Sequence, residues 1–449
     1  MNAGRAAAGG AAATNRRAVL AAALAGAAAP AWSTGGRSTA RAFPKGFLWG
    51  AATAGHQVEG NNVNSDVWQL EQVQPTVFAE PSGDAVNSFE LWATDLELVR
   101  SLGLNAYRFS LEWARIEPEP GQFSMVMLDH YRRIVDGCSA RGLQAVVTFN
   151  HYTTPRWFAQ RGGWLQAGAP DLFARFCDRA ARQLAAGIGH AMTLNEPNIM
   201  RVLRQILPEP VFTGQRAMLA AAARANGAAS FTAGNAVNPE DIDTMSANLL
   251  AGHKAGRAAI KAARSELPVG VTLAMFDDQA DGGYTARRDA MRSDLYGPWL
   301  EAVRGDDFLG VQNYERVVWG ENGRQKPPPG ATLNYAGSEV YAPSLAGAVR
   351  YAHDATQLPI LVSEHGVGTD DDTVRAALFP AALAGLHAAM ADGVPVRGYM
   401  HWSLLDNFEW ISGFRPKFGL FSVDRKTFRR TAKPSAQVYA RIARANALS

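Results

Sequence analysis

The chain has 449 residues, of which 47% are hydrophobic and 19% are charged, and these proportions are typical of a soluble globular protein with a large core. Its formal net charge of +3 is small for this length and gives no case for binding nucleic acid or an anionic surface. The length would suit two or three average domains, although α/β barrels often exceed roughly 250 residues as one unit.

Residues 1–42 differ in character from the rest of the chain. No acidic residue precedes Glu59, while Arg16 and Arg17 precede an Ala-rich apolar run at residues 18–31. This pattern is typical of a bacterial export signal, and the adjacent arginines favour the twin-arginine type. A disordered low-complexity tail is the alternative. We expect export to the periplasm or the cell exterior, with no membrane span in the mature protein, because no segment is long and apolar enough.

From residue 43 onward, short apolar runs alternate with amphipathic helical patterns such as Asp84–Leu102 and Asp129–Arg141. The apolar runs are nearly continuous, as expected for parallel strands that are covered on both faces. Eight such units predict a single (β/α)8 TIM barrel over residues 43–449. A doubly wound sheet is the less favoured alternative, because no Gly-rich phosphate motif follows the first strand. The predicted strands are Phe47–Thr53, Asn105–Leu111, Gln144–Tyr152, Ala191–Glu196, Val269–Met275, Phe308–Tyr314, Ile360–Glu364 and Val396–Ser403.

One connection between these units is unusually long. It runs from Asn198 to Ser246 and contains Pro208, Pro210 and an Ala-rich part. We expect an inserted, partly mobile loop near the mouth of the barrel, because long connections of this kind are often functional.

The two cysteines carry little functional information. Cys138 and Cys177 fall in different helical patterns, without the spacing of a metal site. Buried free thiols are the favoured interpretation, while an oxidising compartment after export leaves a disulfide open.

Polar and aromatic residues gather at or just beyond the carboxyl ends of the predicted strands. In a barrel these ends meet on one face, where catalytic groups belong. The set joins amides, an imidazole and carboxylates, which bind hydroxyls, with indoles, which cover the apolar faces of sugars. It holds no basic cluster for phosphates and no metal-binding spacing, so we expect neither cofactor nor metal. Its members are Gln57, Arg108, His151, Asn195, Glu196, Tyr314, Glu364, Trp402, Glu409 and Trp410.

Glu196 and Glu364 are the most informative members of this set. Each ends an apparent buried strand and has a Pro or Gly within two positions. Most glutamates are solvated surface charges, but two in this setting make that interpretation a poor one. The pair indicates an acid and a nucleophile for the cleavage of an acetal.

A series of motifs occurs in order along the chain and together resembles one family. They are Phe47-Leu48-Trp49-Gly50-Ala51-Ala52-Thr53 with Gln57-Val58-Glu59-Gly60, Tyr107-Arg108-Phe109-Ser110 with Trp113, Thr193-Leu194-Asn195-Glu196-Pro197, Ser363-Glu364-His365-Gly366, Trp402-Ser403-Leu404-Leu405-Asp406-Asn407-Phe408-Glu409-Trp410, and Phe418-Gly419-Leu420. Together they resemble glycoside hydrolase family 1, the β-glucosidase family, over nearly all of the chain after the signal. One motif alone could arise by chance, but the ordered set is very specific.

The resemblance implies a retaining β-glycosidase that hydrolyses terminal β-glucosides, related β-glycosides or oligosaccharides by double displacement. In this interpretation Glu196 is the general acid/base and Glu364 is the nucleophile. Arg108 and Tyr314 would hold the nucleophilic carboxylate, and Asn195 would bind the sugar 2-hydroxyl. The remaining sugar hydroxyls would be bound by Gln57, His151, Glu409 and Trp410. Trp402 would support the sugar ring from beneath. A carboxylate at Glu409 further implies an unphosphorylated sugar.

Four positions depart from the family pattern. His56 stands where Tyr is common, Tyr152 where Trp usually follows His151, and Gln312 and His365 where Asn is usual. None removes a catalytic group, so they bear on the shape of the pocket and on the preferred sugar. For His56 and His365, packing or hydrogen bonding behind the pocket is the favoured role.

Charge arguments give expectations for the two carboxyl groups. Arg108 should lower the pKa of Glu364, and the neighbouring anion and partial desolvation should raise the pKa of Glu196. Once Glu364 is esterified its charge disappears, so Glu196 can act as a base toward water. Retention predicts a carboxyl separation of about 5–5.5 Å.

Two alternatives use the same scaffold. A non-catalytic sugar-binding barrel is disfavoured, because both glutamates and their supporting residues are present. A transglycosylase stays open, as do the preferred glycone, the aglycone and the oligomeric state.

Overall fold

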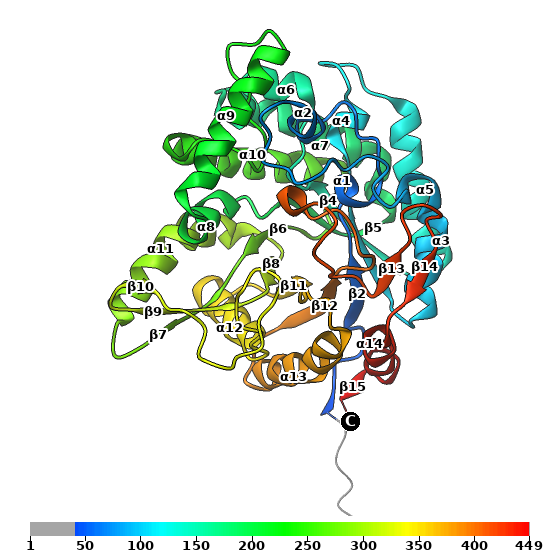
Figure 1. Ribbon diagram of the computed structural model, residues 1–449. Helices are drawn as coiled ribbons and strands as arrows, with labels where there is room; N and C mark the ends of the chain where they lie inside the picture. The colour runs from blue at the N-terminus through cyan, green and yellow to red at the C-terminus, as the bar shows by residue number, and fades with distance from the viewer. Residues whose placement is uncertain (1–40, 449) are drawn as a thin grey trace, which may run out of the picture. The chain divides into compact units, whose positions relative to one another are not determined.

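The computed structural model describes residues 41–448, whose centre is a closed barrel of eight parallel strands (Figure 1). Neighbouring strands follow chain order, and the last strand pairs with the first. All eight predicted strands are present with small shifts at their ends, so the (β/α)8 prediction is confirmed. They are β2 (Leu48–Ala52), β3 (Ala106–Ser110), β4 (Gln144–Asn150), β5 (Ile188–Asn195), β6 (Val269–Ala274), β8 (Leu309–Asn313), β11 (Ile360–His365) and β12 (Val396–Trp402).

Helices surround the barrel and cover the outer faces of its strands (Figure 1). The strands are buried on both faces, which explains their nearly continuous apolar sequences. The two helices predicted individually are both found, with different ends. In chain order the helices are α1 (Gly55–Val58), α2 (Asp66–Gln72), α3 (Ser88–Ser101), α4 (Trp113–Ile116), α5 (Met125–Ala140), α6 (Arg156–Gln160), α7 (Ala169–Leu184), α8 (Ile199–Ile206), α9 (Glu209–Ala225), α10 (Ile242–Ala263), α11 (Thr285–Ala302), α12 (Ser344–Thr356), α13 (Asp372–Ala391) and α14 (Pro434–Ala445).

Short strands outside the barrel form three small sheets. Strands β7 (Asp277–Ala280), β9 (Arg316–Gly320) and β10 (Gly323–Arg324) form one, and β13 (Phe421–Val423) pairs with β14 (Arg430–Ala432). In the third, β1 (Arg41–Ala42) pairs with β15 (Ala447–Leu448), so Arg41 and Ala42 belong to the described fold. The predicted export signal lies outside the described residues.

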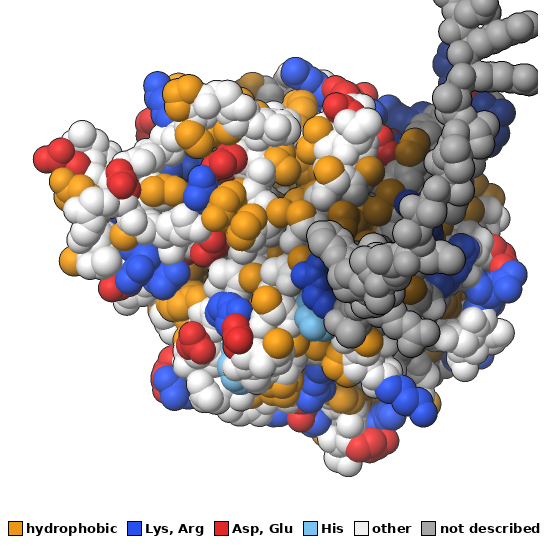
Figure 2. All heavy atoms as spheres, turned by 90° about the horizontal axis from the view of Figure 1, so that it is seen from below, with side chains coloured by type: hydrophobic (Ala, Val, Ile, Leu, Met, Phe, Trp, Pro, Cys, Tyr) orange, Lys and Arg blue, Asp and Glu red, His pale blue; other side chains and the backbone are white. Residues whose placement is uncertain are grey.

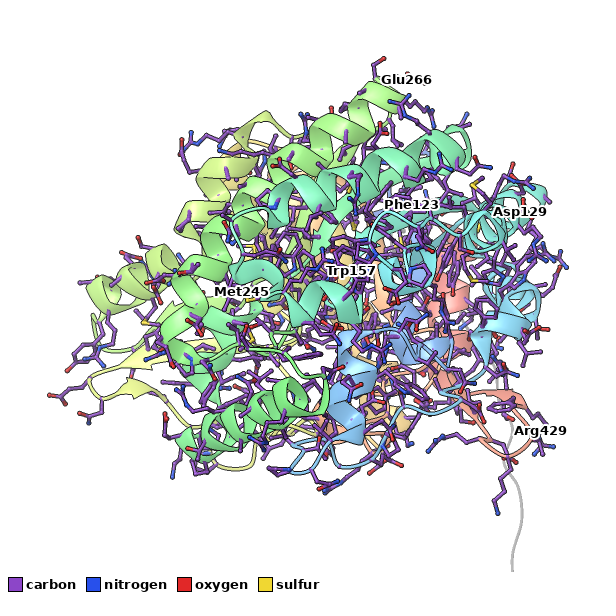
Figure 3. The ribbon with its side chains drawn as sticks, turned by 90° about the horizontal axis from the view of Figure 1, so that it is seen from above. Phe123, Asp129, Trp157, Met245, Glu266 and Arg429 are labelled. Carbon is purple, nitrogen blue, oxygen red and sulfur yellow. The ribbon has the colours of Figure 1, made fainter. Side chains whose placement is uncertain are left out.

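Close helix packing around the barrel depends on small residues. A Cβ on Gly252 would lie 2.7 Å from the Trp164 ring, and one on Gly256 would lie 2.7 Å from the Phe173 ring. These two glycines, one turn apart on α10, let α7 and the Trp164 ring approach closely. Figure 3 views the molecule from above, with Trp157 inside the helical layer and Glu266 at the rim.

The long connection that follows β5 is an insertion, as predicted, but much of it is helical, so only its prediction as a loop is wrong. Residues 199–206 form α8, residues 209–225 form α9, and α10 begins at Ile242. The prolines that favoured a loop lie at the start of α9, where a missing backbone N–H costs nothing. The Ala-rich part is the body of α9 itself, because alanine favours helix.

Helix α13 corrects a second expectation, that no segment is long and apolar enough to span a membrane. Its length and composition would suffice. However, Leu378, Phe379, Leu383 and Leu386 are buried in the barrel core, so its hydrophobicity serves packing.

The two cysteines agree with the favoured interpretation. Cys138 in α5 and Cys177 in α7 are both buried and free. Within residues 41–448, no group of three His, Cys, Asp or Glu side chains is arranged to hold a metal ion. On the visible part of the face in Figure 2, positive and negative side chains are interspersed.

Candidate active site

A cavity of about 380 Å³ lies at the carboxyl ends of the barrel strands. Every predicted site residue except Arg108 lines it: Gln57, His151, Asn195, Glu196, Tyr314, Glu364, Trp402, Glu409 and Trp410. Arg108 is completely buried and hydrogen-bonds two of these lining residues, Asn195 and Glu364. The fold therefore brings the whole predicted set together.

Glu364 lies in β11 and is held by two donors. Arg108 Nη1 donates to its Oε1 at 2.5 Å, and the Tyr314 hydroxyl donates to its Oε2 at 2.6 Å. The strand end packs tightly beneath β12, because a Cβ on Gly366 would lie 2.1 Å from the Trp402 carbonyl oxygen. Glycine is therefore required directly after this part of the strand.

The pKa of Glu364 differs from the expectation. Burial raises this pKa above its ordinary value, although Arg108 and Tyr314 oppose the shift. The predicted lowering is wrong, because the carboxylate loses more from leaving water than it regains from the guanidinium.

Glu196 follows β5 in a strained backbone conformation. Its φ is +40°, and its amide donates to the Thr272 carbonyl oxygen at 2.8 Å. Left-handed non-glycine residues often cluster at functional sites, and Tyr152 and Trp410 beside it also have positive φ. Burial and the charge of Glu364 together raise the pKa of Glu196 to about 8, which confirms the expected direction.

Tyr152 is a site residue that the prediction missed. Its hydroxyl donates a hydrogen bond to Glu196 Oε2, and its ring packs edge-on against Trp410 with centroids 5.2 Å apart. The only sequence signal was the departure from the family pattern at this position. A phenol reaches the carboxylate here and tunes it.

The orientation of Asn195 is fixed by two donors. Arg108 Nη2 and Gln312 Nε2 donate to its Oδ1 at 2.6 and 2.8 Å. Its amide donor group is therefore directed away from Arg108. Gln312, which replaces the family's usual Asn, thus takes part in supporting the site.

Glu409 is the central residue of a polar wall of the cavity, which is completed by Gln57, Trp402 and His151. Gln57 Nε2 donates to its Oε2 at 3.3 Å, and Trp402 Nε1 donates to its Oε1 at 3.2 Å. Burial raises the pKa of Glu409 well above its ordinary value, with these two hydrogen bonds opposing the shift. A ligand that donates hydrogen bonds to this carboxylate would favour its ionised form.

His151 completes this wall between two indoles. Its ring stacks on Trp402 and Trp410 at centroid distances of 5.8 and 6.2 Å. Burial lowers the pKa of His151 well below its ordinary value, so the imidazole is neutral. His151 Nδ1 and Gln57 Oε1 are buried polar atoms without a partner among the described residues, so both are available to a polar ligand.

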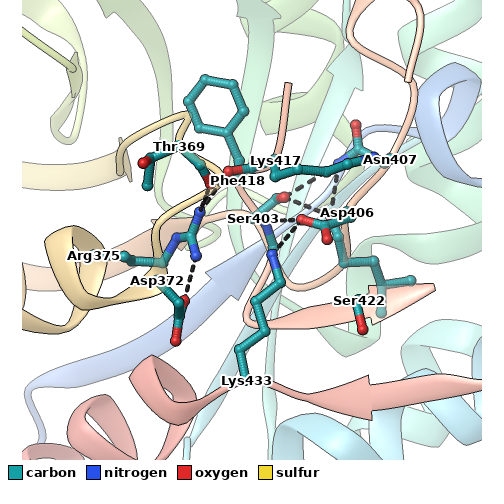
Figure 4. A network of polar contacts seen from close by, with 12 residues as sticks. Thr369, Asp372, Arg375, Ser403, Asp406, Asn407, Lys417, Phe418, Ser422 and Lys433 are labelled. Atoms are coloured by element: carbon teal, nitrogen blue, oxygen red, sulfur yellow. Dashed lines mark hydrogen bonds and ion pairs between the residues drawn. The ribbon is translucent and has the colours of Figure 1, made fainter. Parts of the chain in front are cut away.

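A polar network anchors the loop that carries Glu409 and Trp410 (Figure 4). Asp406 accepts hydrogen bonds from the Gly419 amide at 2.8 Å and from Lys433 Nζ at 2.7 Å. Lys433 immediately precedes α14, so the network fixes the loop to the outer helical layer. The binding wall is therefore rigidly supported before any ligand arrives.

His56 and His365 lie behind the pocket, as favoured from the sequence. His56 Nε2 pairs with buried Glu71 at 2.9 Å, and its ring stacks on Trp410 at 5.8 Å. His365 Nδ1 hydrogen-bonds the Tyr399 hydroxyl at 2.8 Å, and burial lowers its pKa to about 3. Neither side chain lines the cavity, and of the two only His56 packs against a residue of the site, Trp410.

Comparison with known proteins agrees with this geometry. The family model described as glycosyl hydrolase family 1 matches residues 39–232 and 331–448. A β-glucosidase of Agrobacterium sp. is 31% identical over 442 residues, which cover 89% of this chain and 95% of that protein. The human cytosolic β-glucosidase is 28% identical, with 91% and 99% covered.

Solved structures give the same picture. An apo β-glucosidase is 41% identical with a TM-score of 0.85 and covers 89% of this chain and 98% of its own. A crystal structure of a β-glycosidase is 46% identical with a TM-score of 0.84 and covers 91% and 98%.

Proposed function

The chain belongs to glycosyl hydrolase family 1 and is a retaining β-glycosidase that hydrolyses β-glucosides, and we propose that Glu364 and Glu196 carry out its double displacement. The observation that carries this assignment is the unequal support of two buried carboxyl groups in one cavity. Glu364 has a guanidinium and a phenol as donors, whereas Glu196 has only a phenol. Glu364 therefore ionises first and is the nucleophile.

In the first step, Glu364 attacks the anomeric carbon while Glu196 donates its proton to the departing oxygen. The pKa of Glu196, raised to about 8, keeps it protonated at neutral pH. Arg108 and Tyr314 position the attacking carboxylate. Formation of the ester removes the charge that raised the pKa of Glu196, which then acts as the base that activates water.

The glycone is held by the polar wall, with Asn195 as the partner of the 2-hydroxyl. The unpaired atoms of Gln57 and His151, together with Glu409, support binding of the remaining hydroxyls. Trp402 supplies the surface beneath the ring, and Trp410 closes the pocket. A carboxylate at Glu409 favours an unphosphorylated sugar, because it would repel a phosphate dianion.

Trapping the covalent intermediate tests these roles. A 2-deoxy-2-fluoro-β-glucoside with a good leaving group should inactivate the enzyme, and peptide mass spectrometry should find the sugar on Glu364. A label on another residue would contradict the assignment of the nucleophile. Full turnover of the fluorinated glucoside without any adduct would mean that the intermediate is hydrolysed too fast to accumulate.

The same intermediate distinguishes the alternative activities. A sugar-binding protein without activity would neither release a chromogenic leaving group nor accumulate an adduct. A transglycosylase would release the leaving group, but added sugar acceptors would raise the ratio of glycoside product to free glucose above one.

We also propose that the chain is exported through the twin-arginine route, with the signal and linker ahead of β1 and the glycosidase domain from β1 onward. Arg16 and Arg17 and the apolar run that follows support this proposal. Replacement of both arginines by lysine should leave folded, active enzyme in the cytoplasm. Undiminished export of that variant would exclude a twin-arginine signal at these residues.

A further inference from the structure

The cavity has an apolar outer half that the hydrolysis of a glucoside does not by itself require. Four aliphatic side chains of α8 line it, with spacing i, i+3, i+4 and i+7: Ile199, Val202, Leu203 and Ile206. This spacing places them on one face of the helix. Val211 of α9 and Phe276 after β6 continue the apolar surface.

The outer half begins directly beside Glu196. The Ile199 amide donates to the Glu196 carbonyl oxygen at 2.9 Å, so α8 starts one turn after this residue. The proposed acid must reach the oxygen of the leaving group, which places the aglycone on its side of the cavity. The apolar face of α8 therefore lies where the aglycone leaves.

The orientation of α8 is fixed from its other sides. Asn198 Nδ2 donates to the Ala274 carbonyl oxygen at 2.8 Å, and the Ala274 amide donates to Asn198 Oδ1 at 3.1 Å. Arg201 pairs with Asp243 and with Asp294, the latter at 3.2 Å. Figure 1 shows α8 beside β6, at the rim of the barrel. The helix is thus held with its aliphatic face toward the cavity.

Of the polar side chains that line the cavity beyond the inner wall, Gln215 and Glu315 are already engaged by the protein, and Asn235 is the remaining one. Gln215 Nε2 donates to the Val237 carbonyl oxygen at 2.6 Å, and Glu315 accepts from Arg324 at 3.1 Å. A second sugar placed here would lose its water without gaining enough partners for its hydroxyls. An apolar group would instead gain by burial.

We propose that the aglycone site of this enzyme selects β-glucosides of apolar alcohols, with long aliphatic or alicyclic aglycones, over glucosides whose aglycone is a second sugar. This proposal rests on the function proposed above and names the substrate class of the same site. The wall is aliphatic along α8, so selection depends on buried area and is graded by aglycone size.

A homologous series of alkyl β-glucosides tests the proposal. Methyl, butyl, hexyl and octyl glucosides share nearly the same leaving-group chemistry, so differences in kcat/KM report aglycone contacts. We expect kcat/KM to rise by up to about fourfold for each methylene that is buried, until the wall is covered. Concentrations stay below micelle formation, and cellobiose serves as the polar comparison. A flat series, or cellobiose exceeding octyl glucoside, would overturn the proposal.

Leu203→Asn places an amide on the apolar face without changing the catalytic groups. It should lower kcat/KM for octyl glucoside by about tenfold or more, and leave that for methyl glucoside within about twofold. Gln205→Asn is the matched control, because it introduces the same residue on the exposed face of α8 and should change neither. Equal losses on both substrates would show that Leu203 serves only the fold.

Failure of this inference is distinct from failure of the proposed function. If nitrophenyl and methyl glucosides are hydrolysed and the alkyl series is flat, only the aglycone assignment falls. If no glucoside is hydrolysed, the catalytic assignment falls with it.

Discussion

The two halves of the cavity are built on different principles. The inner half is polar, and most of its residues come from the carboxyl ends of barrel strands or the loops directly after them, with hydrogen bonds such as Trp402 to Glu409 already formed. The outer half is aliphatic and is supplied mainly by α8 and α9, two helices in the connection that follows β5. Chemistry and sugar recognition thus depend on the barrel, while recognition of the leaving group depends on inserted helices.

This difference predicts two kinds of response to substitution. In the inner half, removal of one partner leaves another buried polar group unsatisfied, so effects are large and depend on geometry. In the outer half, effects follow the apolar area that is buried and are graded. The substitutions below test this contrast, beginning with the largest expected effect.

Glu364→Ala removes the nucleophile and should lower turnover on the order of 10⁵-fold or more, the scale expected for loss of a catalytic nucleophile. The space left by the carboxylate should admit azide, which would attack directly and give the α-glycosyl azide by a single inversion. Product analysis by NMR checks the configuration. Glu266→Ala, at an exposed position, is the control and should retain full activity. Substantial hydrolysis by the Glu364 variant without azide would contradict the assignment.

Glu196→Ala should give a loss that depends on the leaving group. Alkyl glucosides need protonation of the departing oxygen and should lose about 10²–10⁴-fold. Dinitrophenyl glucoside needs little protonation and should still form the glycosyl-enzyme. Rates across a series of leaving groups measure this dependence, and a uniform loss would indicate a structural role for Glu196.

Glu409→Ser should weaken transition-state binding of the plain sugar by roughly 2–4 kcal/mol, as expected for loss of a charged hydrogen-bond partner from a buried site. It also leaves Trp402 Nε1 without its acceptor, whereas Gln57 Nε2 keeps the Phe408 carbonyl oxygen at 2.6 Å. The wild type should strongly prefer glucosides over 6-phosphoglucosides, and kcat/KM for both substrates measures this. Equal turnover of the two by the wild type would show that this interpretation of the pocket is wrong.

The sequence was sufficient for the inner half and insufficient for the outer half, for physical reasons. Strand ends in a barrel converge, so residues as distant as Gln57 and Glu409 could be grouped from their positions alone. Helix α8 was missed because Pro208 and Pro210 indicated a loop, although both lie at the start of α9. The pKa of Glu364 was misjudged, because the charge of Arg108 could be predicted from the sequence while the extent of burial could not.

Tyr152 lies between the two halves, and its substitution should have the smallest effect. Its hydroxyl donates to Glu196, which favours the ionised form of that carboxyl group. In Tyr152→Phe this support is lost, so the pKa of Glu196 rises from about 8 and the acid stays protonated to higher pH. The basic limb of the kcat/KM profile should therefore move upward in pH, while kcat/KM at pH 6 falls by less than about tenfold. Tyr314→Phe is the contrasting variant: it removes a donor from Glu364, so the acidic limb should move upward instead. A Tyr152→Phe profile with both limbs unchanged would mean that Tyr152 only packs against Trp410.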